Sequence, residues 1–309
     1  MSTTALLAVA AVVLWRPFFW PLRLLVSVAT GLLIVRQFVL FHDYMHGALL
    51  RGSKAARVIL YPSAIFTMTP PRVWRETHNY HHAHTAQLVG SSIGSFATMT
   101  TQQWQEATPA QRLRYKLIRH PLTVLSAYFT IFMFDMCVMS FLRSPKKRWD
   151  SAVALAFNWG MSAFLWIRFG FATFAFVYFV PLAVACAVGA YLFYAQHNFE
   201  GLVIQKREAW CYDRAALHSS SYMELGPLMN YFTANIGYHH VHHLNPCIPY
   251  YRLPEAMAKV PELQNPSRVR LTPAIVAGSF QLKLWDSQLG RMVGYPQAEP
   301  RGVRAASFD

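Results

Sequence analysis

Two long apolar segments constrain the fold of this chain more than any other feature of its sequence. Residues 151–167 and 171–192 contain no charged side chain, and only Arg168, Phe169 and Gly170 separate them. A helix needs about 20 apolar residues to cross the hydrocarbon core of a bilayer, so this pair predicts a helical hairpin in a membrane. The composition agrees, because charged residues make up 14% of the chain, whereas soluble domains average about 25%.

The N-terminal part of the chain predicts a second hairpin. Residues 5–15 and 24–41 are apolar, and Arg36 stands close enough to the end of its segment to reach the membrane interface with its long side chain. A further apolar segment covers residues 121–142 and carries Asp135. Segments 5–15 and 24–41 form one pair, and segments 151–167 and 171–192 form the other. Together the two pairs predict an integral membrane four-helix bundle built from two hairpins.

The positions of Lys and Arg indicate the topology. The formal net charge is +14, and of the 28 basic residues thirteen lie between 51 and 148 and eleven lie after 192. Basic residues concentrate on the cytoplasmic side of membrane proteins, so both blocks are expected there and an even number of helices must separate them. Segment 121–142 has basic residues at both ends and is therefore expected to be interfacial or re-entrant. The charge needs no nucleic acid to explain it, and the sequence has no nucleic-acid-binding motif.

Histidines form three clusters, the boxes HDYMH from residue 42, HNYHH from residue 78 and HHVHH from residue 239. Residues spaced i, i+3 and i+4 project from one face of a helix, so each box presents two or three imidazoles to one point. Each box lies at or beyond the cytoplasmic end of an apolar segment, so all three are expected on one side of the membrane. The eight box histidines at this spacing are His42, His46, His78, His81, His82, His239, His242 and His243.

Eight imidazoles packed together predict metal binding, because without a metal they would repel one another or stay unsatisfied. One ion takes at most about six ligands, so eight ligands predict two ions. Neutral imidazole suits iron, zinc, copper and nickel, but the HExxH motif of zinc proteases is absent. Iron can change its redox state and activate oxygen. We therefore expect two iron ions, and their place at the membrane surface predicts a lipid-like substrate.

At this point the boxes are recognisable as a set. Together with YAQHNFEG (194–201) and FTANIGYHHVHHLNPCIPYY (232–251), they resemble the membrane fatty acid desaturase superfamily, and in particular the bacterial acyl-lipid desaturases of the methyl-end, Δ12/ω6-like type. The resemblance implies four transmembrane helices under a cytosolic helical cap, two irons held by the box histidines with His197 as a further ligand, and the O2-dependent introduction of a double bond into an acyl chain. Some relatives have an asparagine four residues before the ligand that corresponds to His197, whereas the present chain has Phe193 there.

The predicted organisation is a single all-α membrane domain with the three boxes on its cytosolic side. Four polar residues near the boxes, Asp43, Asn198, Glu200 and Asn235, are expected to orient the imidazoles through hydrogen bonds. His84 and His240 stand beside box residues but off the pattern. The predicted parts are a first membrane hairpin (1–41), an interfacial region with two boxes (42–150), a second hairpin (151–192), a cap with the last box (193–290) and a loose tail (291–309).

Electrons for oxygen chemistry must come from another protein. No GxGxxG fingerprint for a flavin or nicotinamide is visible, nor a haem-binding segment, so a ferredoxin, rubredoxin or cytochrome b5 is expected as donor. The basic face would attract an acidic carrier, although topology alone also explains its charge.

Two other functions remain as alternatives at this stage. A hydroxylase, epoxidase or carotenoid ketolase would share the iron chemistry, although the motifs around His197 and His239 favour a desaturase. A metal transporter or membrane sensor would carry polar residues in mid-membrane, and the absence of charge from 151–167 and 171–192 argues against it.

Overall fold

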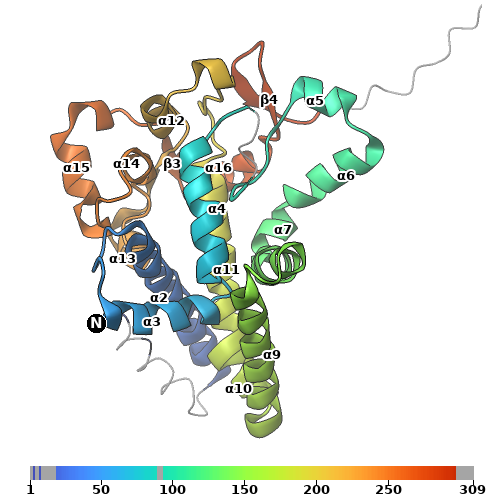
Figure 1. Ribbon diagram of the computed structural model, residues 1–309, viewed down its shortest axis with the longest axis vertical. Helices are drawn as coiled ribbons and strands as arrows, with labels where there is room; N and C mark the ends of the chain where they lie inside the picture. Colours follow the sequence, from blue (N-terminus) through green and yellow to red (C-terminus); the bar gives the residue numbers. More distant parts are fainter. Residues whose placement is uncertain (1–2, 4–6, 8–18, 89–92, 297–309) are drawn as a thin grey trace, which may run out of the picture.

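The computed structural model describes residues 3, 7, 19–88 and 93–296, and within these residues the chain is mostly helical. Figure 1 shows long helices in the lower half of the molecule and many short elements gathered above them. We call the part with the short elements the cap, and its predicted position outside the membrane stays a prediction. The predicted first span, residues 5–15, lies almost wholly outside the described residues.

Three described segments are long and apolar enough to cross a membrane. They are α2 (Trp20–His46), α9 (Trp149–Phe169) and the continuous run of α10 (Phe171–Thr173), the π-helix η2 (Phe174–Phe179) and α11 (Val180–Gln196). The chain turns back between α9 and α10 at Gly170, whose φ of 84° favours glycine. The hairpin expected over 151–192 is therefore present, and its helices extend a few residues beyond the predicted bounds.

The outer surface of these helices is apolar. Phe164 and Trp166 are each 55% exposed on α9, and Ile167 is 85% exposed. Large hydrophobic side chains do not gather on a surface that faces water. Lipid tails are the environment that suits this surface, which together with the three apolar helices indicates a membrane protein.

Helices α2 and α11 pack closely at the centre of the apolar region. A β-carbon added at Gly31 would lie 2.7 Å from the carbonyl oxygen of Pro181 and 2.8 Å from Cβ of Val184. Nearby, the hydroxyl of Ser27 donates a 2.6 Å hydrogen bond to the carbonyl of Phe176. Small residues at such a crossing let two membrane helices approach each other.

Arg36 makes a contact between two helices. Its guanidinium donates to the carbonyl of Tyr231 and lies 4.4 Å from the centre of that ring. Tyr231 belongs to α13 (Gly226–Phe232), which packs beside α2. The side chain therefore ties the long helix to α13, and its expected place at the membrane interface stays a prediction.

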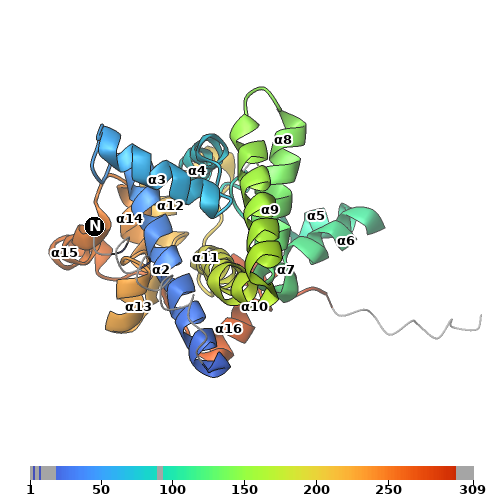
Figure 2. The same cartoon turned by 90° about the horizontal axis from the view of Figure 1, so that it is seen from below.

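The apolar segment predicted at 121–142 forms three short pieces: α7 (Pro121–Leu125), the π-helix η1 (Tyr128–Met139) and α8 (Ser140–Arg143). The run from α7 to α8 lies alongside α9, as seen from below in Figure 2. It is not among the three candidate spans of the described residues. Asp135 is exposed, and its Oδ1 lies 3.8 Å from Nη1 of Arg143. An interfacial or re-entrant position for this segment stays a prediction.

The cap contains short strands as well as helices, so the prediction of an all-α chain needs a small correction. Strand β4 (Leu284–Asp286) lies between β1 (Met99–Thr100), parallel to it, and β5 (Arg291–Val293), antiparallel to it; β2 (Tyr222–Glu224) pairs in parallel with β3 (Arg268–Arg270). Because β5 is paired, residues 291–293 are not part of a loose tail. Residues 297–309 lie outside the described part. The remaining helices of four residues or more are α3 (Lys54–Phe66), α4 (Pro71–His84), α5 (Thr101–Glu106), α6 (Pro109–Ile118), α12 (Tyr212–His218), α14 (His239–Leu244), α15 (Leu253–Lys259) and α16 (Pro273–Ser279).

The close crossing at Gly31 gives a test of the packing. We expect Gly31→Ala to lower the free energy of unfolding by about 1–3 kcal/mol, because the new methyl group would overlap the backbone of α11. Gly189→Ala is the control, since a β-carbon there has nothing within 4 Å. Thermal unfolding in detergent measures both. Equal melting temperatures for the two variants would show that α2 and α11 do not meet at this residue.

Candidate metal centre

The structure brings together all nine histidines that the sequence and the resemblance singled out. They form two groups, and within each group the candidate ligand atoms lie within 4.8 Å of one another. Eight come from the three boxes and the ninth, His197, follows the end of α11. The five-histidine group contains His42, His46, His78, His82 and His242, and the four-histidine group contains His81, His197, His239 and His243.

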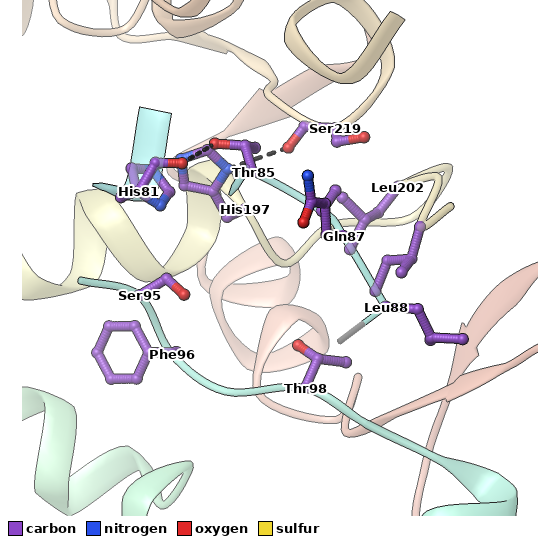
Figure 3. Close-up of a pocket in the computed structure, with 12 residues that line it drawn as sticks. His81, Thr85, Gln87, Leu88, Ser95, Phe96, Thr98, His197, Leu202 and Ser219 are labelled. Atoms are coloured by element: carbon purple, nitrogen blue, oxygen red, sulfur yellow. Dashed lines mark hydrogen bonds between the residues drawn. The ribbon is translucent and has the colours of Figure 1, made fainter. Parts of the chain in front are cut away.

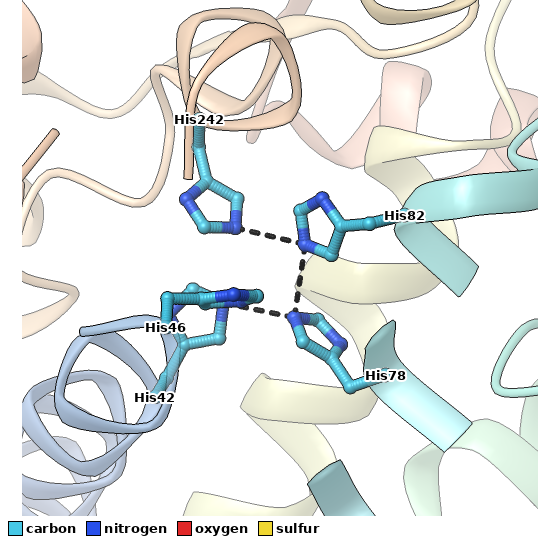
Figure 4. A group of neighbouring side chains, drawn as sticks. All are labelled: His42, His46, His78, His82 and His242. Carbon is cyan, nitrogen blue, oxygen red and sulfur yellow. Dashed lines mark hydrogen bonds between the residues drawn. The ribbon is translucent and has the colours of Figure 1, made fainter. Parts of the chain in front are cut away.

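Three helices supply the five-histidine group, as Figure 4 shows. His42 and His46 are one turn apart at the end of α2, which stops at Gly47 with a left-handed φ of 75°. Helix α4 begins at Pro71, a residue suited to a first helical position. The spacing of α4 then brings His78 and His82 to the same face.

Helices α4 and α14 contribute to both groups. On α4, His81 belongs to the four-histidine group while its neighbour His82 belongs to the other, and His242 and His243 divide in the same way on α14. The rings of His82 and His243 stack with their centres 4.2 Å apart. The two groups therefore lie side by side, because neighbouring residues on one helix turn point to different groups.

The spacing of ring nitrogens matches that of ligands around one ion. Nε2 of His78 lies 3.1 Å from Nε2 of both His42 and His82. In the other group, Nε2 of His239 lies 2.8 Å from that of His197 and 3.1 Å from that of His243. Two nitrogens at right angles around an ion, each bound at about 2.1 Å, would be ~3 Å apart. Both groups therefore have the spacing expected of ligands around one metal ion.

Burial lowers the pKa of most of these imidazoles. The pKa of His78 and that of His239 are lowered well below the usual 6.5, first by burial and then by repulsion from the neighbouring imidazoles. Burial also lowers the pKa of His197 to about 4, although its hydrogen bond to the Ser219 carbonyl acts in the opposite direction. At neutral pH these three rings carry no proton on one nitrogen, and its lone pair is free to bind a metal.

Hydrogen bonds fix which nitrogen faces the group. Nδ1–H of His42 donates to Oδ1 of Asp43 at 3.1 Å, and Nδ1–H of His197 donates to the carbonyl oxygen of Ser219 at 3.0 Å. In both rings this leaves the lone pair on Nε2, the atom that points to the other histidines. Such outer contacts commonly set the tautomer of a metal-binding histidine.

The four residues expected to orient the histidines have different roles. Asp43 contacts His42 directly, and its Oδ2 accepts a 2.7 Å bond from the backbone N–H of Tyr250. Asn235 contributes one step further away, because its side-chain amide donates to the carbonyl of Tyr250 at 3.1 Å. In the described part of the chain, no hydrogen bond or ion pair joins the side chain of Asn198, Glu200 or Asn235 to a histidine ring of the two groups.

Asn198 and Glu200 lie outside the site for different reasons. The guanidinium of buried Arg119 donates to Oδ1 of Asn198 at 2.5 Å, and the Asn198 amide donates to the carbonyl of Ser279 at 2.6 Å. Asn198 therefore anchors the chain just after His197 instead of touching a ring. Glu200 is exposed in a turn.

Three further contacts to the histidines were not foreseen. The ring of Trp74 stacks on His78 at 4.2 Å between centres, and Oγ1 of Thr85 lies 3.4 Å from Nδ1 of His243. The Ser219 carbonyl is the third. Trp74 stands four residues before His78 on α4, so the helical spacing could have predicted this contact. The contact with the Ser219 carbonyl could not have been predicted, because every residue has a backbone carbonyl.

Other histidines are used elsewhere. Nδ1–H of His84 donates to the carbonyl of Tyr80 at 2.9 Å, and Nε2–H of His240 donates to that of Leu263 at 3.2 Å.

Phe193 lies against the four-histidine group, with its ring centre 4.9 Å from that of His81 and 5.5 Å from that of His197. An apolar ring, and not a polar ligand, thus borders this group on α11.

A small cavity reaches the four-histidine group (Figure 3). It touches His81 and His197 and has an apolar side formed by Leu88, Phe96 and Leu202. Its volume is about 40 Å³, which is enough for more than one water molecule, because about 10–15 Å³ suffices for one. The cavity therefore marks a place where small molecules can approach the group, but a whole acyl chain cannot lie in it as it stands.

The fold and the site define a helical membrane protein with two buried histidine groups that could each hold a metal ion. The sequence pattern of the fatty acid desaturase family matches residues 18–273. The chain therefore belongs to the fatty acid desaturase family, whose members are oxidoreductases, and the resemblance seen in the boxes is confirmed.

Individual relatives agree, at low identity. A fatty acid desaturase of Bacillus subtilis (strain 168) is 27% identical, with 89% of this chain and 78% of the relative covered. An sn-1 acyl-lipid omega-3 desaturase (ferredoxin) of Nostoc sp. (strain 36) is 26% identical, covering 79% of this chain and 66% of the relative. An sn-1 oleoyl-lipid 12-desaturase of Picosynechococcus sp. is 24% identical, covering 82% of this chain and 75% of the relative.

Two adjacent histidines provide a matched test of metal binding. We expect His239→Ala to lower the metal content of the purified protein by about half or more, because its ring nitrogen faces three others of the four-histidine group. His240→Ala removes an equally buried ring that faces away, and should keep the metal. Elemental analysis by mass spectrometry measures both. Full metal content in His239→Ala would remove this residue from the site.

Proposed function

We propose that this chain is a membrane di-iron acyl-lipid desaturase, which uses O2 and electrons from an external carrier to place a double bond in an acyl chain. The observation that supports this most is the pair of histidine groups, whose neutral rings face one another in a chain of the desaturase family. Relatives named as acyl-lipid desaturases support the substrate class.

The proposed reaction has a simple balance. Two neighbouring methylene groups lose two hydrogens and form the double bond. O2 takes up these hydrogens together with two electrons from the carrier and two protons, and leaves as two molecules of water. Iron held by the two groups would supply the oxidising power that an unactivated C–H bond requires.

The chain itself contributes positioning and exclusion of water. Neutral imidazoles bind a metal without first losing a proton, and the Asp43 and Ser219 contacts keep their lone pairs aimed inward. Trp74 and Phe193 place apolar rings against the two groups, which protects a reactive site from water. The apolar surfaces of α2 and α11 lead from the bilayer to the histidines, so a lipid chain could be held against them.

The relatives favour a desaturase over an oxygenase. Each of the three compared above is named a desaturase. A hydroxylase or ketolase would insert an oxygen atom and leave a different product, so the lipids themselves decide between the two functions.

The main test is the lipid composition of a host that expresses the chain with a ferredoxin. We expect gas chromatography–mass spectrometry to show fatty acids two mass units lighter, each with one new double bond. His242→Ala should abolish the new product, because the variant removes a ligand of the five-histidine group. Products sixteen mass units heavier would identify an oxygenase, and unchanged lipids with reduced ferredoxin present would contradict the proposal.

We further propose that the histidine groups face the cytoplasm, where the two blocks of Lys and Arg are expected. Cys211 and Cys247 are exposed in the same part of the molecule, whereas Cys137 and Cys186 are buried. A maleimide that cannot cross membranes should therefore label the protein in inside-out vesicles and not in right-side-out vesicles. Labelling from the outer side would reverse the proposed orientation.

A further inference from the structure

A surface hollow of about 590 Å³ lies against the five-histidine group. It is formed by the end of α2, the loop that follows it, α3, α4 and the loop after α14. Six of its lining residues carry the argument: Tyr44, His46, Arg51, Tyr61, Arg75 and Cys247. We call it the arginine hollow.

The arginine hollow has a net positive charge. Arg51 and Arg75 are exposed, no carboxylate lines the hollow, and no ion pair in the described part of the chain involves either arginine. Lys54 and Arg57 on the neighbouring α3 are exposed as well. Unpaired arginines beside tyrosines are typical of protein interfaces, and this charge attracts an acidic surface.

The hollow also gives an exposed approach to the histidines. His46 is the one member of the five-histidine group that is not fully buried. Its ring centre lies 4.7 Å from that of His42 and 4.7 Å from that of His82. Electron transfer slows steeply with distance, so a carrier seated here would benefit from its position beside a ligand of the group.

We propose that the arginine hollow is the docking site of an acidic one-electron carrier protein, and that electrons enter the metal centre through His46. This inference rests on the proposed function for its need of electrons. Two reduced carriers are each oxidised by one electron per O2 consumed, which supplies the two electrons in the balance above. The hollow touches one histidine group and the small cavity of Figure 3 touches the other, so electrons and small molecules have separate approaches.

A lipid headgroup is the competing occupant, since its phosphate would also suit two arginines. The position of His46 argues against it. A headgroup in the hollow would bring the first carbons of its acyl chain to the metal centre, whereas the omega-3 and 12 positions named for the relatives lie far along the chain. A redox carrier, in contrast, benefits from a position beside a ligand.

The test uses the full chain loaded with iron in lipid nanodiscs, and a reduced [2Fe–2S] ferredoxin as the probe. Stopped-flow spectroscopy without oxygen measures electron transfer, and biolayer interferometry measures ferredoxin binding. We expect Arg51→Glu/Arg75→Glu to slow the transfer about tenfold or more and to weaken binding, because both attracting charges are reversed. The wild-type rate should fall as salt is raised, and that of the variant should not.

The control variant is Arg114→Glu/Arg291→Glu, which makes the same change of net charge at exposed residues of α6 and β5 that do not line the hollow. It should behave like the wild type. Dithionite with methyl viologen needs no docking site, and should reduce the iron of all three proteins at equal rates. Equal ferredoxin rates in the two double variants would overturn the proposal, as would an equal loss with both reductants, which would indicate a lipid or structural role.

A second test does not depend on charge. A bulky maleimide on Cys247, in a Cys211→Ser background, should block ferredoxin transfer, whereas the same label on Cys211 in a Cys247→Ser background should not. Both cysteines are exposed and only Cys247 lines the hollow. These measurements need no lipid product. If electron transfer depends on the hollow but no new double bond forms in the lipids, the docking site stands and the proposed desaturase function is contradicted. If new double bonds form at a rate that does not depend on the hollow, the desaturase function stands and the docking site is contradicted.

Discussion

The structure depends on packing nine imidazoles close together. Protonated rings at nitrogen spacings of about 3 Å would repel strongly, and burial removes the water that could screen them. Neutral rings avoid that repulsion but leave lone pairs that need a partner. A metal ion in each group would bind these lone pairs. The rest of the fold serves to bring these rings together and to shield them.

Helices α4 and α14 position most of the clustered histidines. Helix α4 and helix α14 each carry a box in which neighbouring histidines face different groups, so the distance between the two groups is set by the geometry of single helix turns. Helix α2 adds two rings to one group, and the end of α11 adds one ring to the other. The apolar packing of α2 on α11 at Gly31 thus positions ligands for both groups.

The two groups differ in their surroundings, and this difference matters for function. The five-histidine group reaches the surface through His46 and the positively charged arginine hollow. The four-histidine group is bordered by Phe193 and by a small, partly apolar cavity. In the proposed desaturase, electrons would arrive at the first group and small reactants at the second.

The sequence by itself determined the long apolar helices and eight of the clustered histidines, because helix periodicity and box spacing are local properties that survive folding. The family resemblance of its motifs added His197. It could not determine contacts made between distant segments. Arg36 binds Tyr231 in the cap, Asn198 is held by Arg119, and His197 is oriented by a backbone carbonyl at Ser219. The split of each box between two groups and the hollow beside His46 were likewise decided only by the tertiary structure. Both depend on how α2, α4, α11 and α14 pack, and no spacing along the chain encodes the angle between two helices.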